Sequence, residues 1–161
     1  MKKGFTLVEL LVVVAIMGVL AAVGVVSYTG FMGNAKENVT KDNHKKMVNF
    51  MQTTLLKCSI DPSTKLNFVD MGGNPEPPKR CIGPSPEGEI SVIAARFTEH
   101  FRGTFTNPYD PTSSNVSGPG SECSEEAGES RVDWKSSNNT ITLWTRYKKG
   151  EDCLVARVVV E

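Results

Sequence analysis

The stretch Lys2–Leu11, KKGFTLVELL, decides how the fold begins. Two lysines precede an apolar run, as in a secretory signal, yet Glu9 lies inside that run. From Phe5 to Val26 the chain has 22 residues, of which only Thr6 and Glu9 are clearly polar. A helix of this length, at ~1.5 Å per residue, crosses the ~30 Å apolar core of a bilayer. The carboxylate near the start of such a helix therefore requires an explanation.

Three interpretations account for this segment in different ways. A cleaved signal peptide would end near the small residues Ala22-Val23-Gly24, although the apolar run is long for one. A plain membrane anchor would tolerate Glu9 near its end, at less than the ~2.5–3.5 kcal/mol expected at the bilayer centre. In the third interpretation the chain is cut after Gly4, and the free amine of Phe5 pairs with Glu9 of a neighbouring subunit. Such a head-to-tail contact need not close and so builds a filament, in which the buried charges set register more than they add stability.

The residues Lys2 to Leu10 resemble the N-terminal motif of the type IV pilins, a family that includes the pseudopilins of type II secretion. The resemblance covers Met1 to Tyr28, and the chain is most like the major pilin of a type IV pilus. It implies that a prepilin peptidase cuts after Gly4 and methylates the new terminus, Phe5. It also implies that Glu9 is the carboxylate that guides assembly.

The same resemblance divides the chain into three parts. Residues 1–4 are expected to be a leader peptide, and residues 5–27 a transmembrane helix that later forms the filament core. Residues 28–161 are expected to form a globular head that includes the amphipathic half of the helix. Many family members carry a proline in the transmembrane half, where this chain has Val26, so local melting of the helix has less support here.

A single long helix is predicted from Phe5 to Lys57, because a helical period continues beyond the apolar run. Its amphipathic half is expected to bury one apolar stripe in the head. That stripe consists of Phe31, Ala35, Val39, Met47, Phe50, Met51 and Leu55.

The remainder of the chain predicts an α+β head. Dense prolines and glycines make Ser59–Gly88 a loop region, with a short strand possible at Leu66–Val69. A second amphipathic helix is predicted at Glu87–Arg102. The apolar face of this helix consists of Ile90, Ile93, Ala94, Phe97 and Phe101. Asn115–Gly128 is expected to be an exposed loop. Strands are expected at Arg131–Trp134, Thr140–Tyr147 and Cys153–Val160, with a turn at Lys148–Asp152. The fold class is thus pilin-like, with a long N-terminal helix packed on a C-terminal antiparallel sheet.

Four cysteines and an export signal favour two disulfides formed in an oxidising compartment. Four cysteines allow three connectivities. Cys58–Cys81 and Cys123–Cys153 are preferred because each pair closes a short loop. None of the cysteines forms a C-x-x-C pair, and His44 and His100 are distant in sequence, so a zinc site is not expected.

Other chemistry is weakly indicated. Equal numbers of basic and acidic residues, 18 of each, give no electrostatic support for nucleic-acid binding, and no specific nucleic acid is predicted as a partner. An acidic cluster could in principle bind calcium, but it lacks EF-hand spacing and is expected to be a solvated loop. Its members are Glu122, Glu125, Glu126 and Glu129. His44 is expected on the polar, solvated face of the long helix, and His100 at a helix end where a cation is favourable. We expect no cofactor, no metal and no enzymatic activity.

The function expected from the sequence is that of a structural subunit of a type IV pilus filament, which would serve adhesion, motility or DNA uptake. The precursor would lie in the bacterial inner membrane, and the assembled homo-oligomer outside the cell. One alternative is a pseudopilin of a type II secretion system, which would act in the periplasm. The other alternative is a soluble secreted binding protein with an ordinary signal peptide.

Overall fold

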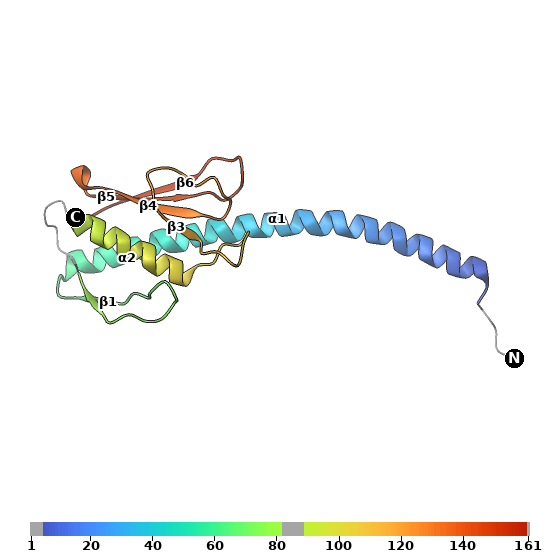
Figure 1. Ribbon diagram of the computed structural model, residues 1–161, viewed down its shortest axis with the longest axis horizontal. Coiled ribbons are helices and arrows are strands. Elements are labelled where there is room, and N and C mark those ends of the chain that lie inside the picture. Colours follow the sequence, from blue (N-terminus) through green and yellow to red (C-terminus); the bar gives the residue numbers. More distant parts are fainter. Residues whose placement is uncertain (1–4, 82–88, 161) are drawn as a thin grey trace. The chain divides into compact units, whose positions relative to one another are not determined.

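The computed structural model describes residues 5–81 and 89–160. The chain divides into two units, Met1–Ala35 and Lys36–Glu161. The helix α1 (Leu7–Ile60) contributes to both (Figure 1). It begins two residues after the predicted start and extends three residues past the predicted end, where Asp61-Pro62 interrupts the helical pattern.

The first unit consists of the apolar part of α1. Every side chain from residue 5 to residue 34 is exposed, although most of them are apolar. Helix α1 is also the one helix within the described residues that is long and apolar enough to cross a membrane. Because a monomeric soluble protein rarely exposes so large an apolar surface, this segment requires a membrane or other subunits around it.

In the second unit, the remaining part of α1 packs against α2 (Glu89–Thr104) and a four-stranded sheet. Met47 and Met51 are completely buried, and Phe50 and Leu55 pack at the edge of the same core, as predicted. The prediction for two other members of the stripe is wrong. Phe31 is 68% exposed and Val39 is 48% exposed. The next buried residue after Ala35 is instead the polar Thr40, which a pattern of apolar residues cannot detect.

The sheet has the order β3-β4-β5-β6. Its strands are β3 (Val116–Pro119), β4 (Ser130–Lys135), β5 (Thr140–Thr145) and β6 (Leu154–Val159). Strands β4, β5 and β6 are antiparallel, as predicted, and are joined by tight connections through the 3₁₀ turn η1 (Ser136–Asn138) and the turn at Lys148–Asp152. Asn139 after η1 and Gly150 in the second turn adopt positive φ values of 47° and 80°.

Strand β3 was not predicted, and it changes the character of the sheet. It pairs with β4 in parallel, so the sheet is mixed rather than purely antiparallel. The segment Asn115–Gly128 is therefore not simply an exposed loop: Asn115 and Val116 are fully buried. Its serines and glycines are typical of a loop. In addition, a four-residue strand has too few apolar residues to produce a visible alternation.

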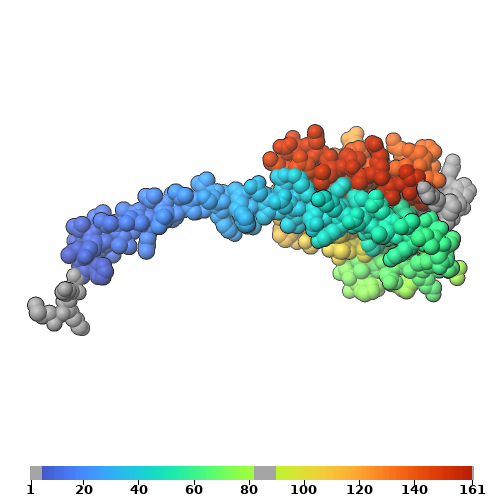
Figure 2. Space-filling view, turned by 180° about the vertical axis from the view of Figure 1, so that it is seen from behind, coloured from blue at the N-terminus to red at the C-terminus, as the bar shows by residue number. Residues whose placement is uncertain are grey.

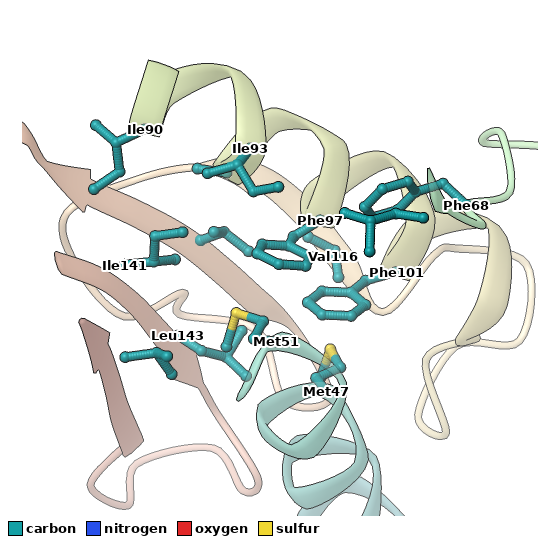
Figure 3. Packing of buried hydrophobic residues seen from close by; sticks show 14 residues of the cluster. Met47, Met51, Phe68, Ile90, Ile93, Phe97, Phe101, Val116, Ile141 and Leu143 are labelled. Atoms are coloured by element: carbon teal, nitrogen blue, oxygen red, sulfur yellow. The ribbon is translucent and has the colours of Figure 1, made fainter. Parts of the chain in front are cut away.

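One apolar core holds the head together (Figure 3). Its apolar members come from α1, α2, the four-stranded sheet, and Leu66 and Phe68 in and after β1. Figure 3 shows Met47 and Met51 pointing toward Phe97, Phe101 and the strands. All five apolar residues predicted for the second helix are buried, so the face assigned to α2 is confirmed. The predicted start of that helix at Glu87 lies outside the described residues. Figure 2 shows β6, in dark red, lying along the final turns of α1, in cyan and green.

Two short strands and two disulfides complete the head. β1 (Lys65–Leu66) and β2 (Lys79–Arg80) pair antiparallel, so the strand expected at Leu66–Val69 is shorter and begins one residue earlier. Val69 forms only an isolated bridge, with Pro75. The structure joins Cys58 to Cys81 and Cys123 to Cys153, with Cα atoms 5.4 and 6.2 Å apart, which is the preferred pairing.

Candidate functional site

The start of α1 is held by a reciprocal capping arrangement between Thr6 and Glu9. Glu9 Oε2 accepts hydrogen bonds from the backbone N–H and the hydroxyl of Thr6, both at 2.8 Å. The backbone N–H of Glu9 donates to Thr6 Oγ1 at 3.3 Å. This is a capping box, in which a Thr at the N-cap and a Glu three residues later satisfy free N–H groups of the first turn.

Sequence reasoning missed this role, although the signal was present. The T-x-x-E spacing of Thr6 and Glu9 before an apolar run is a recognised helix-start pattern. The interpretation above assigned Glu9 only to contacts between subunits. The structure adds a second task, because Glu9 also fixes where its own helix begins and places a negative charge at the positive end of the helix dipole.

The capping box leaves part of the Glu9 carboxylate available. Both Thr6 groups donate to the same oxygen, and within the described residues Oε1 accepts no hydrogen bond. A carboxylate has about four acceptor positions, so Glu9 can keep its cap and still accept a donor from another chain. Phe5, which is 84% exposed, directly precedes the cap. Gly4, the predicted cleavage residue, lies outside the described residues.

Beyond the cap, the helix surface suits close packing with other apolar helices. Leu7, Leu10, Leu11, Val14 and Ala15 line a shallow apolar groove along one side of the helix. Further along, a Cβ placed at any of four glycines would meet nothing within 4 Å in the single chain. These are Gly18, Gly24, Gly30 and Gly33. Small residues on an apolar helix allow neighbouring helices to approach closely.

His44 is buried in the head, so the prediction of a solvated side chain was wrong, whereas His100 is half-buried and lies near the end of α2, where it was expected. His44 is 8% exposed, and its Nδ1 lies 2.8 Å from Thr145 Oγ1. The same threonine oxygen is 2.8 Å from Ser130 Oγ, which donates to Asn115 Oδ1 at 3.1 Å. This buried polar chain links α1 to β5, β4 and the segment before β3. Burial lowers the pKa of His44 to about 4, so the ring is neutral at pH 7.

His100 is not a cation at the end of α2. Its ring stacks on Phe50 with centroids 4.2 Å apart, and Nδ1 accepts a hydrogen bond from the backbone N–H of Val69 at 3.1 Å. Burial lowers the pKa of this ring as well. The neutral His100 therefore joins α2, α1 and the loop after β1, instead of stabilising a helix end by charge.

The acidic segment between β3 and β4 provides no metal centre among the described residues. No group of three or more His, Cys, Asp or Glu side chains converges in that part of the chain. One of its carboxylates, that of Glu129, accepts a hydrogen bond from Ser124 Oγ at 2.5 Å. Arg146 Nε donates to Ser124 O at 2.6 Å, so an arginine and a disulfide tie this segment to the β5–β6 turn.

Comparison with known proteins agrees with the geometry of the amino-terminal segment. Residues 1–25 match the model of the prokaryotic N-terminal methylation motif. The chain is 33% identical over 81 residues to the type IV major fimbrial protein FimA of Dichelobacter nodosus, covering 47% of this chain and 50% of that protein. It is 42% identical over 46 residues to the type IV major pilin protein PilA of Myxococcus xanthus, covering 29% of this chain and 21% of that protein.

The motif and these relatives confirm the resemblance to type IV pilins that was predicted from Lys2 to Leu10. The aligned regions span half or less of each relative's length. No solved structure gives a significant match to this chain. The capped apolar helix is thus the part of the molecule on which a functional assignment is best based.

Proposed function

We propose that this protein is the structural subunit of a type IV pilus filament. The observation that carries the proposal is the capped apolar helix, whose side chains from residue 5 to residue 34 are all exposed in the single chain. A filament of packed helices would bury this surface, and each Val or Leu that becomes buried contributes roughly 1.5–3 kcal/mol. Burial of apolar area would therefore hold the assembled helices together in water, whereas transfer from the bilayer, where the same side chains already contact lipid, would depend on close packing between the helices.

Leader cleavage between Gly4 and Phe5 would add a charge to this helix end. The new α-amine of Phe5, which the family resemblance expects to be methylated, stays positive at the end where the helix dipole is already positive. The amine therefore needs an acceptor when surrounding subunits exclude water. The Glu9 carboxylate of an adjacent subunit is suitable, because its Oε1 remains available while Oε2 caps its own helix. This pairing would fix the axial step between subunits.

The location and partners follow from the same proposal. The precursor would be anchored in the bacterial inner membrane through the apolar part of α1, processed by a prepilin peptidase, and added to an extracellular filament by the pilus assembly machinery. The main partner would be further copies of this chain. The role is that of a building block, and it does not require catalysis by the subunit.

The first experiment is to measure the mass of the N-terminal peptide in filaments sheared from the native cell surface. A peptide that begins at methylated Phe5 is expected. Recovery of the protein only in the periplasm would indicate the pseudopilin alternative. A terminus near Val25 in soluble material would instead indicate an ordinary secreted protein.

Two variants separate the two tasks of Glu9. Glu9→Ala removes both the cap and the carboxylate, and is expected to leave the protein in the membrane with no filaments. Thr6→Ala removes the N-cap hydroxyl but keeps the carboxylate, so filaments should form at a reduced level. Glu37→Gln, on the same helix, is the matched control and should assemble normally. Normal filaments from Glu9→Ala would contradict the assembly role.

A further inference from the structure

Helix α1 has a long uncharged interval between Glu9 and Lys36. No residue from 10 to 35 carries a charge, and Lys36 directly follows the last of them. The two charged residues are 27 positions apart in one uninterrupted helix, which corresponds to ~40 Å at ~1.5 Å per residue. A bilayer is about 40–45 Å thick when its headgroup regions are included. With Glu9 in one headgroup region of a membrane, Lys36 therefore reaches the other.

The head brings two tyrosines to this part of α1. Lys36 Nζ lies 5.8 Å from the centre of the Tyr109 ring, and Lys41 Nζ lies 4.3 Å from the centre of the Tyr147 ring. Tyr109 Oη donates a hydrogen bond to Tyr147 O at 2.7 Å, which joins the segment after α2 to the segment after β5. Tyrosine and lysine both suit a membrane–water interface, because each has an apolar body and a polar or charged tip.

The charges of this cluster are not all satisfied within the head. Lys41 Nζ lies 2.6 Å from Glu37 Oε1, and Lys148 Nζ lies 3.5 Å from Glu151 Oε1, so each of these lysines has a carboxylate partner. In the part of the chain that the structure describes, no carboxylate lies within salt-bridge distance of Lys36. Lys36 is also half-buried, so its ammonium is held beside the Tyr109 ring. Lys36 is thus the cation of this cluster that can accept an anion from outside the chain.

We propose that Lys36 and Tyr109 bind the headgroup of an anionic phospholipid, and so hold the head at the membrane surface before the subunit enters a filament. The inference rests on the proposed function, since it concerns the membrane-anchored form of that subunit. The Lys36 ammonium pairs with the lipid phosphate, and the Tyr109 ring lies at the level of the headgroups. Lipid is the partner that the geometry favours, because Lys36 belongs to α1 itself and the ~40 Å interval places it at that level.

The test is photocross-linking of the full chain in lipid vesicles. A photoreactive benzophenone amino acid replaces Pro111, which is exposed and lies two residues after Tyr109. The vesicles contain either phosphatidylcholine alone or phosphatidylcholine with one third phosphatidylglycerol. Intact mass is expected to show a covalent lipid adduct, several-fold more abundant with phosphatidylglycerol. The matched control places the same amino acid at Val92, which is 44% exposed and lies 12 residues before the end of α2, and should give no adduct.

Substitution of Lys36 tests the cation directly. Lys36→Gln is expected to reduce the adduct with phosphatidylglycerol roughly fivefold, which is the contribution of one lysine near an anionic membrane surface. Lys36→Arg keeps the charge and should keep the adduct. Lys46→Gln is the matched control, because Lys46 lies on the same helix with its Nζ 2.8 Å from Asp42 Oδ2, and it should leave the adduct unchanged. Thermal unfolding of the head should be the same in all three variants.

The outcomes distinguish the lipid contact from the proposed function. Equal adducts in the two kinds of vesicle, an equal adduct at Val92, or an undiminished adduct in Lys36→Gln would overturn the contact alone. A cross-link from Pro111 to a second copy of the chain in place of lipid would also overturn it, because this surface would then face protein. Absence of the chain from surface filaments, with the lipid adduct intact, would overturn the filament proposal and leave the contact standing. Failure of α1 to insert into either kind of vesicle would overturn both.

Discussion

The apolar segment and the head use similar residues with opposite results. Leu7 and Val8 are 80% and 71% exposed, whereas Met47 and Phe97 are completely buried. The head completes its core with its own strands and helix, and two disulfides join its loops to that core. The segment from residue 5 to residue 34 has no such complement within the described residues, so its side chains remain available. The head is therefore built for its own stability and the apolar segment for contact with other molecules.

The largest effect should come from truncating a core residue of the head. Phe97→Ala is expected to lower the free energy of unfolding of the head by about 3–5 kcal/mol, because it leaves a cavity among rings that lie about 6 Å apart. Val14→Ala should leave the stability of the head unchanged. Denaturation of the full chain in detergent, followed by near-ultraviolet circular dichroism, measures both. Equal losses of unfolding free energy in the two variants would contradict the distinction between the two regions.

The pH dependence of the head should reveal its buried histidine. The pKa of His44 is lowered from 6.5 to about 4 in the folded head, so the unfolded chain binds more protons in this range. The contribution of the neutral His44 to the free energy of unfolding is therefore fully present above pH 6.5. It is lost as the pH falls toward 4, by about 3 kcal/mol in total. His44→Gln should remove most of this decline. Urea denaturation at pH 7 and pH 4.5 provides the comparison, and an unchanged pH profile in the variant would show that His44 is not responsible.

Glycine-to-alanine substitutions should have opposite effects in the head and in the apolar segment. A Cβ on Gly103, in α2, would collide with the backbone of Asp70, so Gly103→Ala should destabilise the head by about 1–3 kcal/mol. A Cβ on Gly30 would meet nothing within 4 Å, and Gly30→Ala should favour the helix by about 1 kcal/mol. Thermal unfolding tests the first variant. If Gly30→Ala reduces filament yield while the single chain folds normally, close packing between copies at this position is the reason.

The smallest effect should come from the helix cap. Thr6→Ala removes the hydroxyl that receives the Glu9 N–H, and is expected to destabilise the first turn by about 1 kcal/mol. Thr6→Ser should retain the cap. Amide hydrogen exchange of the first helical turn in detergent micelles detects the difference. Exchange at wild-type rates in Thr6→Ala would mean that surrounding detergent, and not the capping box, holds this end.

Much of this architecture was readable from local pattern. The apolar run predicted α1, and the spacing of Ile90, Ile93, Phe97 and Phe101 predicted the buried face of α2. The alternation in Thr140–Tyr147 predicted β5, and the β-branched, apolar residues of Cys153–Val160 predicted β6. These predictions were correct because each element contains enough apolar residues to display its period within its own sequence.

The parts that were missed depend on residues far apart in the chain. His44 looked like a solvated side chain because its neighbours on α1 are lysines, and its partner Thr145 is 101 positions away. Strand β3 is only four residues long, and its pairing with β4 is what makes it a strand. Stacking of His100 on Phe50 likewise needs α2 and α1 to be packed together.

Local sequence is enough to specify the apolar helix, its start signal at Thr6 and Glu9, and the face on which α2 packs, because those properties depend on neighbours within a few residues. Which polar side chains are buried and how β3 joins the sheet depend on the tertiary structure, because the partners concerned lie far apart in the chain. A polar group is stable in the interior when a partner satisfies it, and that partner is set by the fold and not by the adjacent residues.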